Sequence, residues 1–266
     1  MNNTFNLNRF LLLFKKHTIE HGKTYLLSAA VLAGILLFIL GYLMYINDGY
    51  INVNRQAMIF TWLMLAAGCI FTSLTFTDLG DKKRAFSLLT LPASHFEKYL
   101  VSWIYTYVIF QLVFVGAFYL VDSIVISCGN PSKGGLNVLI NILSQNDNGF
   151  YPFRIYVVLH AFTFWGAVFF EKTHFIKTAF IFFIVMIVLG IVNAKLPQII
   201  IDKNVGGLPL GGVHPLGGVH YINTVTHQQW WISAPESIKM VGKIGAGLIA
   251  LIFWASAFFR LKEKEV

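Results

Sequence analysis

Residues 25–46 read YLLSAAVLAGILLFILGYLMYI, a run that contains no Asp, Glu, Lys or Arg. A helix needs about 20 mostly apolar residues to cross the hydrocarbon core of a bilayer. A helix at the surface of a soluble domain would instead alternate a polar and an apolar face. The run therefore predicts a membrane-spanning helix.

Five further segments have the apolar character of spanning helices, and they are 57–76, 99–121, 155–170, 175–192 and 241–259. The fourth and fifth of the six spans are short, and only residues 171–174 separate them, which predicts a tight helical hairpin. We therefore predict an all-α integral membrane protein, with residues 1–266 forming a single transmembrane domain of six helices.

The composition agrees with lipid as the main solvent. The 266 residues are 56% hydrophobic and 12% charged, whereas a soluble domain carries roughly 25% charged residues. The mean hydropathy is +0.67. A net charge of +8 could indicate nucleic-acid binding, but no basic stripe with interleaved aromatic residues is present. We expect the lipid bilayer as a partner and no nucleic acid.

The placement of Lys and Arg predicts the topology. With the N-terminus inside, thirteen of the 20 Lys and Arg residues fall on the cytoplasmic side. The remaining seven are Arg55, Lys133, Arg154, Lys195, Lys203, Lys239 and Lys243. The positive-inside rule then places both termini and residues 77–98 in the cytoplasm, and 122–154 and 194–240 outside. The expected location is the cytoplasmic (inner) membrane, as a multi-pass protein.

The N-terminal residues 1–24 predict an amphipathic helix in the cytoplasmic interface. Phe10, Leu13 and Phe14 would share one face, with basic residues beside them. A frayed basic tail is the alternative.

Two external loops are large. In 122–154, apolar residues 136, 139, 140 and 143 recur at helical spacing, which predicts a short interfacial helix. In 194–240, the sequence LGGVHP at 210–215 is followed by LGGVH at 216–220. Two copies are too few for a solenoid, and we expect an irregular loop against the outer helix ends.

Three histidines of the second loop, His214, His220 and His227, suggest a metal site. Their spacings of six and seven residues lie in a Gly-rich loop without a nearby Cys, unlike the short fixed spacings of zinc ligands. We favour ordinary loop histidines and predict no metal site.

The connection at 77–98 reads TDLGDKKRAFSLLTLPASHFEK and is more than a passive linker. Asp78 can cap a short helix, on which Phe86 and Leu89 share one face before Pro92 stops it. Such a helix would lie parallel to the membrane between two spans.

A second local signal follows at once. Ser94 and Glu97 have the spacing of a capping box, in which each residue's side chain bonds the other's backbone amide. This box is expected to open the third span.

The order of these elements resembles the membrane-spanning subunit (permease) of type 2 ABC transporters. The most specific match is RAFSLLTLPAS at 84–94, running on to Glu97-Lys98. Many members have Gly-Thr where Ala85-Phe86 stands, and often Arg where His95 stands. The motif covers about 20 residues, and the likeness in architecture extends over the whole chain.

The resemblance implies an exporter permease whose coupling helix docks on a separate ATP-binding subunit. It also implies a second permease subunit, as a homodimer or heterodimer. ATP and Mg²⁺ would be bound by the ATP-binding partner, and this chain would hold no cofactor and no catalytic residues. The implied partner-binding residues are Asp81, Lys82, Arg84, Phe86, Leu88 and Leu89.

The chain lacks the Gly-x-x-x-x-Gly-Lys-Ser/Thr loop that cradles nucleotide phosphates, so the energy would come from another polypeptide. One alternative is a membrane-embedded enzyme, but the spans contain almost no acidic residues for such a site. Another is a non-transporting signalling or assembly subunit. His160, inside the fourth span, is either functional or a neutral histidine hydrogen-bonded within the bundle.

Overall fold

The computed structural model describes residues 5–75, 93–129, 137–142, 151–170, 174–200, 207–214, 218–223, 229–233 and 235–263. Within them, six helices are long and apolar enough to cross a membrane. Each of the six predicted spans falls on one of these helices. The structure thus confirms the predicted fold class in its main features, a mainly helical protein with six helices suited to span a membrane.

The first helix, α1 (Leu7–Ile46), is continuous over 40 residues. The expected boundary at residue 24 is therefore not a break in the helix. At 1.5 Å per residue α1 is about 60 Å long, roughly twice the thickness of the hydrocarbon core. Phe10, Leu13 and Phe14 are all half-buried on one face, as the sequence predicts.

The helix α2 (Val53–Thr75) runs back beside α1. The third span then consists of α4 (His95–Trp103), η2 (Ile104–Ile109) and α5 (Phe110–Cys128), and it is helical without interruption from 95 to 128. The middle piece, η2, is a π-helix. Residues 122–128 therefore belong to this span and not to an external loop, because apolar residues continue beyond Asp122 until the helix ends at Gly129.

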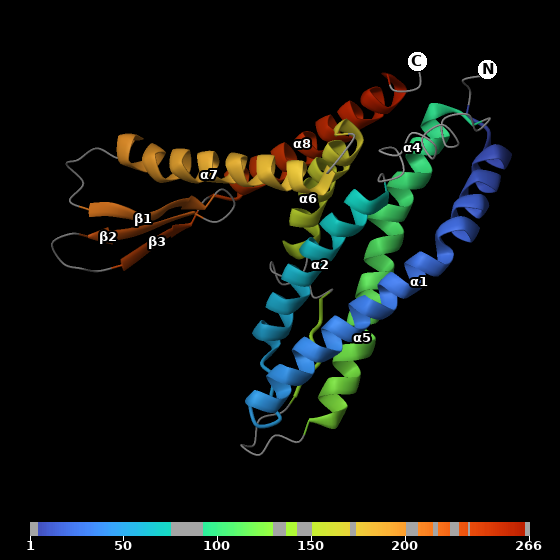
Figure 1. Cartoon of the computed structure of the whole chain (residues 1–266). Coiled ribbons are helices and arrows are strands. Elements are labelled where there is room, and N and C mark those ends of the chain that lie inside the picture. Colours follow the sequence, from blue (N-terminus) through green and yellow to red (C-terminus); the bar gives the residue numbers. More distant parts are fainter. Residues whose placement is uncertain are drawn as a thin grey trace.

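The beginnings of α1 and α4 and the end of α8 (Glu236–Glu263) lie at one end of the bundle, which we call the terminal end (Figure 1). The end of α1, the beginning of α2 and the end of α5 lie at the opposite end, the far end (Figure 1).

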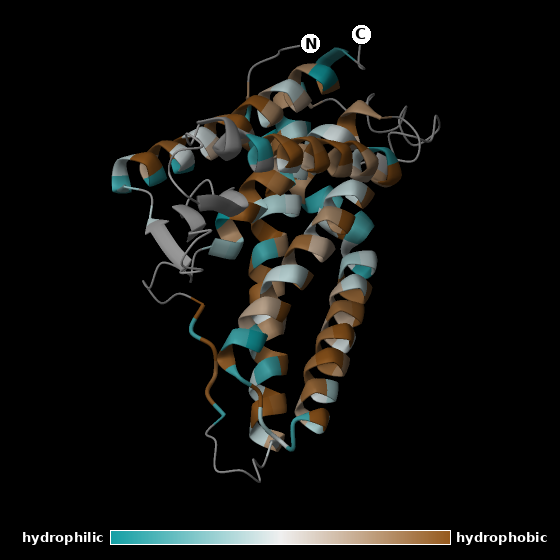
Figure 2. Ribbon diagram, turned by 90° about the vertical axis from the view of Figure 1, so that its left-hand side faces the viewer, coloured by the Kyte–Doolittle hydropathy of each residue, from teal (hydrophilic) through white to brown (hydrophobic). Residues whose placement is uncertain are grey.

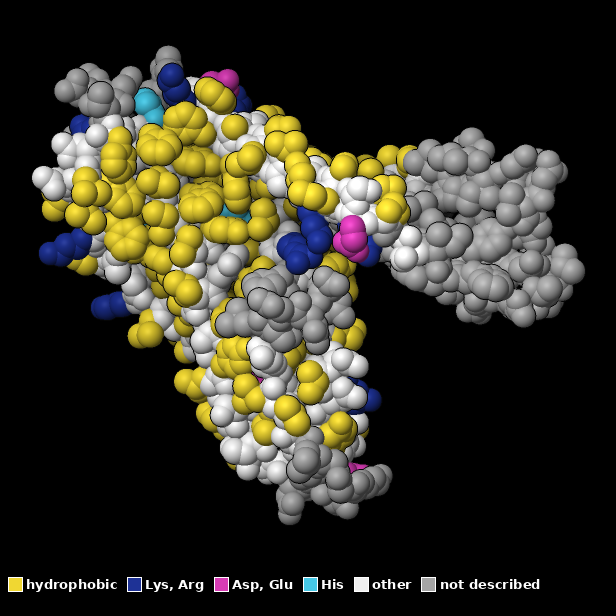
Figure 3. Space-filling model, turned by 180° about the vertical axis from the view of Figure 1, so that it is seen from behind, with side chains coloured by type: hydrophobic (Ala, Val, Ile, Leu, Met, Phe, Trp, Pro, Cys, Tyr) yellow, Lys and Arg dark blue, Asp and Glu magenta, His cyan; other side chains and the backbone are white. Residues whose placement is uncertain are grey.

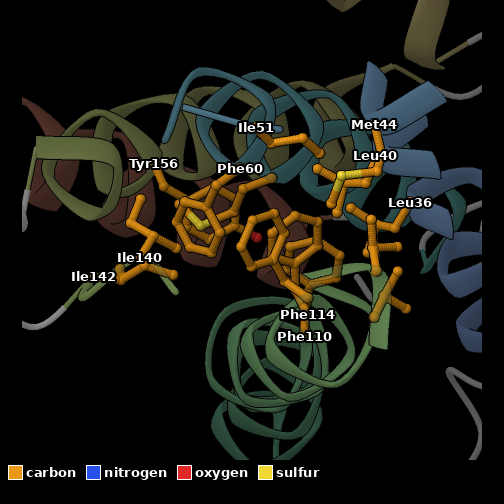
Figure 4. Packing of buried hydrophobic residues seen from close by; sticks show 14 residues of the cluster. Leu36, Leu40, Met44, Ile51, Phe60, Phe110, Phe114, Ile140, Ile142 and Tyr156 are labelled. Atoms are coloured by element: carbon orange, nitrogen blue, oxygen red, sulfur yellow. The ribbon is translucent and has the colours of Figure 1, made fainter. Parts of the chain in front are cut away.

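The core of the bundle is aromatic and aliphatic. Phe60 of α2 packs between Phe114 and Phe118 of α5, with ring centroids 5.4 and 5.0 Å apart. Figure 4 shows Phe60 and Phe114 within this cluster, with Leu36 and Leu40 of α1 at one side of it.

The outer surface is apolar as well. Large hydrophobic side chains such as Leu26, Phe38 and Ile252 are exposed by two thirds or more of their surface. Long hydrophobic stretches cover the helices in Figure 2, and hydrophobic side chains cover a broad face in Figure 3. Apolar residues both inside and outside a helical bundle are what a lipid environment favours.

Three helices complete the bundle. The helix α6 (Tyr151–Phe169) is the most buried span and packs against α2, α7 and α8. The helix α7 (His174–Ile200) meets α6 where Thr178 is buried against Gly166. Beyond this contact α7 crosses the direction of α1 and α5 at a steep angle (Figure 1), and most of its apolar side chains are exposed.

The segment expected to be an irregular loop contains a three-stranded antiparallel sheet. Its strands are β1 (Gly207–His214), β2 (Gly218–Asn223) and β3 (Gln229–Ser233), in the order β1-β2-β3. The two copies of the repeat lie opposite each other, with Val213 paired with Val219. The expectation of an irregular loop is thus wrong for these residues.

The connection between α5 and α6, predicted to be an external loop, also differs from expectation. Residues 137–142 are not helical, because the backbone is held by the buried side chain of Gln56. The Gln56 amide nitrogen donates to the carbonyl of Val138 at 3.1 Å, and its oxygen accepts from the amide of Ile140 at 3.1 Å. The described part of this loop is therefore a non-helical segment hydrogen-bonded to Gln56 of α2.

Candidate functional site

The predicted coupling residues Asp81, Lys82, Arg84, Phe86, Leu88 and Leu89 all lie outside the described residues. The structure does describe what flanks them, namely the end of α2 and the residues from 93 onward. The start of α4 belongs to the terminal end of the bundle (Figure 1), whereas α2 ends near the middle of α1, where the rings of Phe71 and Tyr25 pack with centroids 5.3 Å apart.

The capping box predicted at the start of the third span is present. The amide of Glu97 donates to the hydroxyl oxygen of Ser94 at 3.2 Å, and the amide of Ser94 donates to the Glu97 carboxylate at 2.9 Å. This geometry satisfies two amides that a helix N-terminus would otherwise leave unpaired.

The same carboxylate also binds the N-terminus of α1. Glu97 is completely buried and accepts from the amide of Asn6 at 2.8 Å and from Nη2 of Arg9 at 3.0 Å. Asn6 is itself the N-cap residue of α1. We call Asn6, Arg9, Ser94 and Glu97 the Glu97 network. It joins the first helix to the end of the 77–98 segment.

Aromatic contacts reinforce this junction. Phe5 packs edge-on against Phe96, with centroids 6.0 Å apart, and Phe96 packs in the same way against Phe258 of α8. The ring of Phe14 lies 4.9 Å from that of Tyr105. The start of α4 is thus held from one side by α1 and from the other by α8.

A second polar cluster lies deeper in the bundle, around the π-helix. The hydroxyl of Tyr156 donates to the carbonyl of Thr106 at 3.0 Å, and Nε2 of His160 lies 3.0 Å from the Thr106 hydroxyl. The indole nitrogen of Trp254 lies 3.2 Å from Nδ1 of His160. We call Thr106, Tyr156, His160 and Trp254 the His160 network. It links the third span, α6 and α8.

These contacts fix the tautomer of His160. An indole N–H can only donate, so Nδ1 of His160 must accept and Nε2 must carry the proton. Nε2 then donates to the Thr106 hydroxyl, which donates in turn to the carbonyl of Ser102 at 2.8 Å. Both ring nitrogens are therefore engaged, and His160 serves as a directional link between helices, the second of its two interpretations from sequence.

The network also explains where the π-helix sits. The amide of Phe110 bonds to the carbonyl of Tyr105, five residues back, and a π-turn of this kind is less regular than an α-turn. Tyr156 supplies the donor for the Thr106 carbonyl within this turn. Single π-turns occur frequently at functional positions of helices, which makes η2 a candidate point of movement.

One buried acid was missed by the sequence analysis, which placed it at the start of an external loop. Asp122 lies on α5 and is completely buried. It follows Phe114 and Phe118 at intervals of four residues, so its position on their buried face could have been read from helical spacing.

The comparisons with known proteins identify no relative: no family model, no curated protein and no solved structure matches the chain. Among the residues that the structure describes, no group of three or more His, Cys, Asp or Glu side chains could hold a metal ion.

Proposed function

We propose that this chain is the permease subunit of an ATP-binding-cassette transporter. It exports a substrate across the cytoplasmic membrane with energy from a separate ATP-binding subunit, which binds ATP and Mg²⁺. A second permease subunit completes the translocation path. The terminal end of the bundle faces the cytoplasm, where ATP is available.

The Glu97 network is the observation that carries this proposal. A coupling helix is useful only if its displacement reaches the spanning helices. Here the residues that follow the 77–92 stretch are bound to α1 through the buried carboxylate of Glu97. This carboxylate accepts from the amide of Asn6, from Nη2 of Arg9 and from the amide of Ser94, the N-cap residue of α4. A force applied to the connection would act on α1 and α4 together.

In this proposal the two large apolar residues of the coupling segment, Phe86 and Leu89, fill an apolar groove on the ATP-binding subunit. Arg84 lies at the rim of that contact and sets its orientation. Exposed ion pairs contribute only about 0.2–1 kcal/mol, whereas a central aromatic anchor contributes about 2 kcal/mol or more. Phe86 should therefore matter more than Arg84.

The test is co-purification of the tagged chain from its native membranes, followed by ATPase measurements in nanodiscs. Wild type should bring down an ATP-binding subunit. Phe86→Ala should weaken the complex about thirtyfold or more and abolish stimulated hydrolysis, while Arg84→Ala should be milder.

Phe38→Ala is the matched control, because Phe38 is an aromatic residue exposed on α1 and should leave assembly unchanged. The proposal fails if no ATP-binding subunit co-purifies with wild type, or if Phe86→Ala assembles and hydrolyses ATP like wild type.

A further inference from the structure

Asp122 is a buried carboxylate on α5. The residue is completely buried, and neither of its carboxylate oxygens has a hydrogen-bond partner among the residues that the structure describes. Placing an ionised carboxylate in apolar surroundings without compensation is very costly, and such a group is neutralised instead. The structure must therefore supply either a counter-ion or a proton.

The buried residues closest to Asp122 along α5 are apolar. On its own helix Phe118, Val121 and Val125 belong to the buried cluster. On α1, Met44 lies against Gly129. The two helices run in the same direction, and Asp122 is seven residues before Gly129. The same distance back from Met44 places Leu36 and Leu40 of α1 level with Asp122. Both leucines are completely buried in the same cluster.

Among the described residues, the titratable groups of α1, of the start of α2 and of α5 near this end are directed elsewhere. Tyr42 and Tyr45 of α1 are largely exposed. Asp48 lies in the exposed turn after α1. Arg55 at the start of α2 is exposed and donates to Asn47 at 2.6 Å. The hydroxyl of Tyr119, on α5 itself, accepts from the amide of Ile142 at 3.1 Å.

A proton is the ligand that fits this site. Calcium takes 6–8 oxygen ligands and magnesium about six, and no cluster of acidic, His or Cys side chains is found in the described part of the chain. A proton needs only the one carboxylate. Asp122 is six residues from the exposed Cys128 at the end of α5, about 9 Å along the helix, so water at the far end is close.

We propose that Asp122 is a proton-binding site, which holds its proton while α5 is packed against α1 and exchanges it with water at the far end when this contact opens. The site does not depend on an ATP-binding partner, and it makes the opening of the far end sensitive to pH.

Infrared spectroscopy of the purified full-length chain in nanodiscs tests the proposal directly. At pH 5 the wild type should show the carbonyl stretch of a protonated carboxylic acid in apolar surroundings, and Asp122→Asn should lack it. Asp48→Asn, in the exposed turn after α1, should leave the band unchanged. Absence of the band from wild type, or its persistence in Asp122→Asn, would overturn the proposal.

The pH dependence of unfolding gives a second measurement. Unfolding exposes the Asp122 carboxyl to water, where it ionises, so one proton is released. The folding equilibrium constant of wild type should then fall about tenfold per pH unit relative to Asp122→Asn, from the ordinary range of carboxyl groups up to the pH at which Asp122 also ionises in the folded protein. If the Asn variant does not fold, Asp122→Leu, whose side chain is apolar like the neighbouring residues, replaces it as the reference in this comparison. Parallel pH profiles of wild type and variant would contradict the site.

Discussion

Nη2 of Arg9 lies 3.0 Å from Oε1 of Glu97, across 88 positions of sequence, and the Glu97 side chain is fully buried. Removal of one partner of a buried ion pair costs about 3–5 kcal/mol. Because Glu97 also accepts from two backbone amides, Glu97→Ala should destabilise the protein by about that amount. Arg9→Ala, which leaves both amide bonds in place, should cost less. Thermal unfolding in detergent measures both.

The matched control for this pair is Glu263→Ala. Arg260 and Glu263 form an ion pair of the same chemistry at 2.6 Å, but both side chains are well exposed. Its loss should change stability by about 0.5 kcal/mol or less. Equal effects of Glu97→Ala and Glu263→Ala would mean that the Glu97 network does not hold α1 to α4.

Tyr156→Phe should loosen the π-helix. The substitution keeps the ring but removes the donor to the buried Thr106 carbonyl, which costs about 1–3 kcal/mol. Amide hydrogen exchange at residues 104–110 should accelerate, while exchange in α2 stays slow. Tyr45→Phe is the control, because Tyr45 is exposed on α1. Unchanged exchange at 104–110 in Tyr156→Phe would show that η2 is stable without this bond.

Gly68→Ala should separate α2 from α6. A Cβ atom at residue 68 would lie 2.2 Å from Cε2 of the buried Tyr156 ring, and overpacking of this kind costs about 1–3 kcal/mol. Gly116 on α5 has no atom within 4 Å of the equivalent position, so Gly116→Ala should be neutral or slightly stabilising. Unfolding of the two variants in the same detergent gives the comparison, and equal stability would refute the close contact.

Cys128 reports which side of the membrane the far end occupies. Cys128 is exposed at the end of α5, whereas Cys69 lies within α2. With the proposed topology, an impermeant maleimide should label Cys128 in intact cells, and Cys128→Ser should abolish labelling. A cysteine placed at Lys83 in the Cys128→Ser background should react only after permeabilisation. The reverse pattern would place the termini outside.

Local patterns of sequence were sufficient for much of this fold. The six spans follow from apolar length alone, and the Ser94–Glu97 capping box follows from a spacing of three residues. Both signals depend on residues that are neighbours in the chain, so no knowledge of tertiary structure is needed.

Features that depend on distant residues could not be predicted in this way. Nothing near Glu97 in sequence indicates that Arg9 is its partner. The carbonyl of Thr106 in the π-helix accepts its side-chain hydrogen bond from Tyr156, fifty residues later. The extended segment at 137–142 has the apolar spacing of a helix, yet Gln56 holds its backbone in another conformation. The predicted third span ends at residue 121, so Asp122 is assigned to the loop that follows.

The π-turn in the third span changes the rotation of α4 about the helix axis relative to α5. A π-turn closes on the fifth residue where an α-turn closes on the fourth, and one residue of an α-helix corresponds to about 100° of rotation and 1.5 Å of rise. Conversion of Ile104–Ile109 to α-helix would therefore turn the half that carries Glu97 relative to the half that carries Asp122 by a fixed step. The third span would then have two rotational states of α4 relative to α5, and the hydrogen bond from Tyr156 to the Thr106 carbonyl favours the state with the π-helix.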